Sequence, residues 1–203
     1  MWVIADTETS GLLKRGLPLH APEQPWIVSI SAEHIGPDRE TISFFSSRIR
    51  AEDGRLIEDG ASGVHGISSR SAARHGVPAI VGIGFLCHMA SDARYVVGWG
   101  LDFDRQIVEG ELIRRKKDTR LWTRPGLAFV DLMKVATNFC RIPHPEPRDD
   151  NQWKWPSLDE ACEKLLGEER RGQHHGWDDV QRTKRLFFWL LDRGAIEMTG
   201  ATT

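Results

Sequence analysis

The feature that most constrains the fold lies at the start of the chain, where a short apolar run passes directly into two acids. Residues Trp2 to Ala5 are typical of a buried strand, and Asp6 and Glu8 follow at once. Because side chains alternate along a strand, both carboxylates point to the same side. Their mutual repulsion is costly without a cation, and hard oxygen ligands suit Mg²⁺ or Mn²⁺. The pattern predicts a strand ending in a metal site; the simpler alternative is a strand ending in a polar turn.

Further strand and helix patterns alternate along the chain. Strands are expected over residues 26–32, 41–45 and 95–98 and at the start of 129–136. Helices are expected after Ser68 or Ser69, from Pro78 to Ala90, from Leu101 to Ile113, from Ser157 to Leu166, and before Gly194. Residues 51–63 are expected to cross irregularly, and 14–25 and 143–151 to be surface loops.

Length and composition bound the architecture. At 203 residues the chain is long enough for one substantial core and short for two, so we expect one domain over residues 1–194 and a short tail over 195–203. The formal net charge of −2 excludes a globally basic nucleic-acid binder. A local basic groove remains compatible with it, and bound ions would add positive charge at the acids.

Cysteine usage and the N-terminus bear on location. Cys87, Cys140 and Cys162 are far apart and lack a C-x-x-C spacing, which predicts buried thiols in a reducing compartment. No run approaches the length of a membrane span, and no basic segment precedes an apolar core at the N-terminus. Because the first strand starts at residue 2, a removable targeting peptide has no room. We therefore expect a cytoplasmic protein without membrane contact.

The string Asp6-Thr7-Glu8-Thr9-Ser10-Gly11-Leu12 resembles the first motif of the DnaQ-like, DEDDh-type 3′ to 5′ exonucleases. Later stretches resemble the other motifs of that family, in the same order. Phe103-Asp104 resembles the second motif, although Trp99-Gly100 stands where many members have His-Asn. His174 and Asp179, five positions apart, resemble the third. The resemblance extends from residue 3 to about residue 191.

The resemblance implies a fold and a set of catalytic residues. The fold is the ribonuclease H-like α/β architecture, a mixed five-stranded sheet with three antiparallel strands, two strands added in parallel, and helices on both faces. Two divalent ions, Mg²⁺ or Mn²⁺, would be held by four acids, Asp6, Glu8, Asp104 and Asp179. His174 would take the proton from the attacking water. Five residues along a helix turn a side chain by about 140°, so His174 is expected in the loop before the last helix.

The resemblance also implies a pocket for the 3′-terminal nucleotide. Val64-His65-Gly66-Ile67 resembles the segment in which the family's His contacts that nucleotide. The expected substrate-binding residues are Thr9, Gly11, Leu12 and His65, with Trp99 supplying stacking. The family often has an acid five positions before this His, where this chain has Gly60 beside Glu58 and Asp59.

Several of these signals have plain structural alternatives. Asp104 could stabilise a helix dipole from the first turn, and His65 could be a polar turn residue. The basic run over residues 114–117 is a solvated helix end or, less simply, a phosphate-contacting patch. Trp153 and Trp155 could stack on bases or pack under the neighbouring proline loop.

Together the motifs predict a metal-dependent 3′ to 5′ exonuclease that releases nucleoside 5′-monophosphates, foremost from single-stranded DNA. Its expected partners are nucleic acid with a free 3′ end and a polymerase or repair complex, and the oligomeric state stays open. An RNA-directed exonuclease of the same fold is the first alternative. A polymerase-associated proofreading or binding subunit and a catalytically inactive nucleic-acid-binding module are the others.

Overall fold

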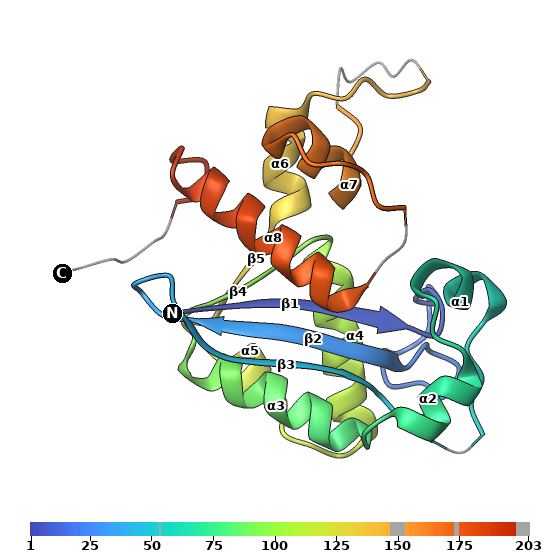
Figure 1. The fold of residues 1–203 in the computed structure, drawn as a ribbon. Coiled ribbons are helices and arrows are strands. Elements are labelled where there is room, and N and C mark those ends of the chain that lie inside the picture. Colours follow the sequence, from blue (N-terminus) through green and yellow to red (C-terminus); the bar gives the residue numbers. More distant parts are fainter. Residues whose placement is uncertain (53, 147–152, 173–174, 198–203) are drawn as a thin grey trace.

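The computed structural model describes residues 1–52, 54–146, 153–172 and 175–197, and within them five strands form one sheet (Figure 1). The strands are β1 (Trp2–Thr9), β2 (Ile27–Ile35), β3 (Thr41–Arg48), β4 (Tyr95–Gly98) and β5 (Ala128–Asp131). Their order across the sheet is β3-β2-β1-β4-β5. β2 pairs antiparallel with both β1 and β3, whereas β4 pairs parallel with β1 and β5. This confirms the predicted mixed sheet.

Helices connect the strands and follow the sheet. They are α1 (Asp59–His65), α2 (Ser69–His75), α3 (Ala79–Asp92), α4 (Leu101–Arg114), α5 (Arg120–Thr123), α6 (Leu132–Cys140), α7 (Leu158–Ala161) and α8 (Gly176–Leu191). A π-helical turn, Cys162–Leu166, continues α7. The predicted caps are present: Ser68 accepts from the Ser71 amide, and Ser157 forms a capping box with Glu160.

The sheet has a separate hydrophobic core on each face, which confirms the expected helices on both sides (Figure 1). Val3 and Ala5 pack into the core beneath α3 and α4. Ile4, between them, packs into the core formed with α6, α7 and α8. The alternation along β1 therefore fixes which side of the sheet each of its polar residues faces, since side chains alternate by one residue.

The prediction for residues 51–63 was wrong in part, because 59–63 belong to helix α1. Two glycines give its seven residues weak intrinsic helix propensity. Contacts at the C-terminal end stabilise the helix: the His65 side chain is buried, and Gly66 ends the helix in a left-handed conformation with φ 69°. Tertiary contacts form this helix, which a periodicity argument does not detect.

Other boundaries moved less. β2 and β3 run on to Ile35 and Arg48, beyond the predicted strand ends. The domain boundary at 194 stays a prediction; of the residues after it, Ile196 is buried in the core beside α8. All three cysteines are buried and free, as expected. Within the described ranges, no helix is both long and apolar enough to cross a membrane.

Candidate active site

Three acids from distant parts of the chain meet where β1 ends. Asp6 and Glu8 lie on the face of β1 that looks toward α8, and Asp179 lies in the first turn of α8. Each offers a carboxylate oxygen, and the three oxygens lie within 4.8 Å of one another. The predicted placement of Asp179 in the first turns of the last helix is confirmed.

A glycine lets α8 begin this close to the sheet. A Cβ on Gly176 would lie 2.8 Å from the Ser31 hydroxyl oxygen and 3.3 Å from Asp6 Oδ2. A side chain here would displace the Ser31 hydroxyl or the start of α8. The short approach brings the helix N-terminus, which favours negative charge, over the acid cluster.

Asp104 reaches the same strand from α4. Its Oδ1 accepts hydrogen bonds from the Thr7 amide at 3.0 Å and the Thr7 hydroxyl at 2.5 Å. Its charge raises the pKa of Asp6, so the two carboxylates are within electrostatic range. The structure thus brings Asp6, Glu8 and Asp179 within ligand distance of one another. Thr7, which lies between Asp6 and Glu8, holds Asp104 beside them.

The electrostatics of the acids fit a divalent cation. Burial, then the charges of Asp104, Glu8 and Asp179, raise the pKa of Asp6 well above its ordinary value. Burial, with a further contribution from Glu8, raises the pKa of Asp104 to about 7 against the Thr7 hydrogen bonds. Asp6 Oδ2 is buried without a hydrogen-bond partner among the described residues. An ion with oxygen ligands would satisfy that atom and neutralise the cluster.

The raised pKa values predict that metal-free protein loses stability as pH rises. A carboxyl whose folded pKa lies above its unfolded value stabilises the fold at low pH, and this stability is lost as pH rises through the folded pKa. For Asp104 that window runs from about pH 4 to about pH 7. In EDTA at pH 8, Asp104→Asn should therefore melt above wild type by at least ~3 °C, the shift that about 1 kcal/mol produces in a chain of this size.

Thermal melts of both proteins at pH 5 and pH 8, with EDTA or Mn²⁺, test this. The advantage of Asp104→Asn should shrink at pH 5, and it should disappear when Mn²⁺ stabilises wild type. An Asp104→Asn protein that melts below wild type in EDTA at both pH values would show that Asp104 is a structural hydrogen-bonding group.

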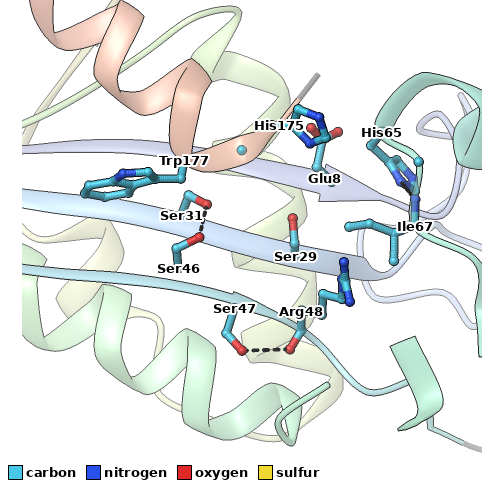
Figure 2. A pocket seen from close by; sticks show the side chains of 12 residues that line it. Glu8, Ser29, Ser31, Ser46, Ser47, Arg48, His65, Ile67, His175 and Trp177 are labelled. Atoms are coloured by element: carbon cyan, nitrogen blue, oxygen red, sulfur yellow. Dashed lines mark hydrogen bonds between the residues drawn. The ribbon is translucent and has the colours of Figure 1, made fainter. Parts of the chain in front are cut away.

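Two cavities adjoin the acid cluster at Glu8, and both Glu8 and His65 line each of them. The apolar cavity, about 380 Å³, is lined chiefly by Gly11, Leu12, Ala61, Val64 and Phe103. The hydroxyl cavity, about 340 Å³, is lined chiefly by Ser29, Ser31, Ser46, Ser47, Arg48, His175 and Trp177 (Figure 2). Both volumes fall in the usual range for small-ligand sites, about 300–1,000 Å³.

Four predicted substrate-binding residues line the apolar cavity: Thr9, Gly11, Leu12 and His65. Leu12 projects with 80% of its surface exposed. His65 is held at both ring nitrogens, with Nδ1 accepting from the Ile67 amide at 3.1 Å and Nε2 lying 3.3 Å from the Thr9 carbonyl oxygen. Since the Thr9 carbonyl can only accept, Nε2 carries the proton. Trp99, by contrast, is half-buried against the core beside α8 and is not among the residues lining either cavity.

No family model matches the chain, and no curated protein sequence does. Among solved structures, E. coli exonuclease I in complex with a dT13 oligonucleotide has a TM-score of 0.74 at 18% identity, over 95% of this chain and 41% of that chain. The zinc-bound E. coli exonuclease I complex with single-stranded DNA gives 0.74 at 17% identity, over 95% and 40%. A product-bound exonuclease I gives 0.70 at 16% identity, over 94% and 43%. The chain shares the exonuclease I fold.

The expected ribonuclease H-like architecture is thereby confirmed. The chain spans about two fifths of the length of the exonuclease I structures that it matches. At identities of 16–18% the likeness establishes the fold alone.

The predicted general base, His174, lies outside the described residues. Its neighbour His175 caps the start of α8 and lines the hydroxyl cavity together with Glu8 (Figure 2). Two of the basic residues at the end of α4 form ion pairs within the protein, since Arg114 and Arg115 both pair with buried Glu111. This favours the structural interpretation of that run.

Two features near the site were not predicted as part of it from the sequence. The Glu58 carboxylate lies against Gly11 in the apolar cavity, seven positions before His65, where the family's acid was expected at five. The hydroxyl cavity was also missed. Its signal was the alternation of Ser29 and Ser31 with apolar residues in β2, a polar stripe within an otherwise buried strand.

Proposed function

We propose that the chain is a metal-dependent 3′ to 5′ exonuclease of the DEDDh type, acting foremost on single-stranded DNA and releasing nucleoside 5′-monophosphates. The observation that carries the proposal is the meeting of Asp6, Glu8 and Asp179 within ligand distance, with Asp104 beside them and with Glu8 lining two cavities. The shared fold with exonuclease I, solved in complexes with oligonucleotides, supports it.

In this proposal the four acids hold two divalent ions, Mg²⁺ or Mn²⁺. Bound ions would lower the pKa of a water and stabilise the leaving 3′ oxygen. His174 accepts the proton of that water. A histidine side chain titrates near physiological pH, so its neutral imidazole is available to take a proton. The acids of β1 and α8 come from rigid elements, so the chain fixes their positions before substrate arrives.

The apolar cavity is proposed to hold the 3′-terminal nucleoside. Exposed Leu12 and Val64 and half-buried Phe103 offer apolar contact to a base. The two hydrogen bonds of His65 fix the wall of this cavity between α1 and β1. An end that fits here places only the last phosphodiester at the acids, which gives 3′ to 5′ polarity.

The polarity is tested with 5′-labelled single-stranded DNA ending in a 3′-hydroxyl or a 3′-phosphate, and with circular single strands, in Mg²⁺, Mn²⁺ or EDTA. The 3′-hydroxyl strand should shorten stepwise in either ion and stay intact in EDTA, and the 3′-phosphate should slow the reaction at least ~10-fold by adding charge in the apolar cavity. Rapid cleavage of circles would indicate an endonuclease. Matched duplex DNA and RNA in the same assay decide the strand preference, and faster RNA decay would support the RNA-directed alternative.

A further inference from the structure

The hydroxyl cavity continues from the acids across β2 to the sheet edge at β3. Strand register sets its floor: Glu8 lies opposite Ser29, and Ser29 lies opposite Arg48. A second row runs from Asp6 through Ser31 to Ser46. In both rows the side chains face α8. Each residue lies two or four positions along its strand from a residue on that side, namely Ile4 in β1, Glu33 in β2 or Phe44 in β3, and side chains alternate along a strand. A carboxylate, a hydroxyl and a guanidinium therefore follow one another outward from the site.

The floor is open because α8 begins only above Asp6 and Ser31. Further along β2 on the same face, Glu33 is covered by α8 and bonded to Lys184 and Gln181. Ser29 and Arg48 lie on the other side of the helix start and line the cavity instead (Figure 2). The Ser31 and Ser46 hydroxyls, 2.9 Å apart, complete a surface of hydrogen-bonding groups.

Arg48 is the cation of this floor. In the described part of the chain its guanidinium has neither an ion pair nor a side-chain hydrogen bond, while its carbonyl oxygen accepts from the Val77 amide at 2.9 Å and from the Ser47 hydroxyl at 3.2 Å. Two strand spacings, roughly 10 Å, separate its backbone from that of Glu8. An uncommitted guanidinium beside hydroxyl donors suits a phosphate oxygen.

An aromatic pair lies at the outer side of the cavity, with Trp177 lining it and Phe44 packed against Trp177. Trp177, in the first turn of α8, contacts Phe44 of β3 with ring centroids 5.1 Å apart and a tilt of 43°. Phe44 is 66% exposed, so one face of its ring is open to solvent. Aromatic rings beside a cationic side chain are a combination that binds single strands without sequence preference.

We propose that the hydroxyl cavity holds the nucleotides on the 5′ side of the scissile phosphate, with Arg48 contacting a backbone phosphate and Trp177 with Phe44 stacking on a base. The inference rests on the proposed function and deepens it. Since Glu8 and His65 line both cavities, a strand whose 3′ nucleoside fills the apolar cavity leaves the acids through the hydroxyl cavity. The occupant is a single strand, because Arg48 and Trp177 line a cavity of only about 340 Å³, with Phe44 packed beside Trp177.

The experiment compares Arg48→Gln with wild type on dT2 and dT8. The dinucleotide has only the scissile phosphate, so its kcat/KM should be unchanged, whereas kcat/KM for dT8 should fall about 5- to 20-fold, mainly through KM. The salt dependence of KM for dT8 should also weaken by about 0.7 in log–log slope, the value for one lost phosphate contact on a single strand. Trp177→Ala should also lower kcat/KM for dT8, and Trp177→Phe should restore most of the loss.

The matched control is Arg74→Ala, which removes an exposed arginine of α2 that lines neither cavity and should leave both substrates unaffected. Equal losses on dT2 and dT8, or none on either, would overturn the inference. If wild type hydrolyses neither substrate, the proposed function fails. The inference is then decided by the anisotropy of labelled dT8 in EDTA, where weaker binding by Arg48→Gln supports it and unchanged binding overturns it.

Discussion

Replacing any one of Asp6, Glu8, Asp104 or Asp179 by alanine is expected to lower exonuclease turnover by more than about 10³-fold in Mg²⁺ while the protein stays folded. Burial and the charges of Asp104, Glu8 and Asp179 raise the pKa of Asp6, and a bound cation would relieve this repulsion. Losing a ligand removes both activation of the water and stabilisation of the leaving oxygen. A 10³-fold loss corresponds to roughly 4 kcal/mol of barrier.

Two neighbouring acids provide matched controls for this prediction. Asp102 lies in the same first turn as Asp104 but pairs with Lys134 at the surface. Asp178 precedes Asp179 and pairs with Arg171. Asp102→Ala and Asp178→Ala should keep turnover within about twofold of wild type, since exposed pairs contribute little. Full turnover by Asp104→Ala would refute the second-motif assignment, which carries the imperfect flank at Trp99-Gly100.

His174→Ala is expected to lose about 10²- to 10⁴-fold in turnover, the usual scale for removing a positioned proton acceptor. His175→Ala should lose far less, although its side chain lines the hydroxyl cavity beside Glu8. Only the five-residue spacing to Asp179 selects the first of the two histidines. The acidic limb of the pH-rate profile should flatten in His174→Ala, because protonated imidazole cannot accept the proton.

Single-turnover rates measured beside melting temperatures separate the roles of the two histidines. If either ring merely packs the loop, its removal should lower stability and rate together. An inactive His175→Ala beside an active His174→Ala would show that the general base is the residue that caps α8.

Local signals predicted much of the fold and the first part of the site. The apolar run before Asp6 and Glu8 gave β1 and the common side of both acids, and the Ser157 capping box gave the start of α7. These features depend on residues within one turn or one strand. Their physics is local, so the sequence contains it directly.

Features that depend on distant contacts were not predictable in the same way. The anchoring of Asp104 by Thr7 joins residues 97 positions apart. Whether Arg48 is a surface charge or part of a cavity depends on where α8 begins. The helix can begin close to the sheet because Gly176 has no side chain. Trp99 was expected beside substrate because of its position in a motif. Instead it packs against the hydrophobic core between the sheet and α8, a contact that local sequence does not reveal.

The most direct test of the account is the product pattern from a 5′-labelled single-stranded DNA with a free 3′ end, incubated in Mg²⁺ with wild-type protein and with folded Glu8→Ala. Wild type should give a nested ladder that shortens from the 3′ end and release nucleoside 5′-monophosphates, and Glu8→Ala should leave the strand intact. An intact strand with wild type in both Mg²⁺ and Mn²⁺, or the same ladder from Glu8→Ala, would contradict the assignment of these acids to 3′ to 5′ exonuclease chemistry.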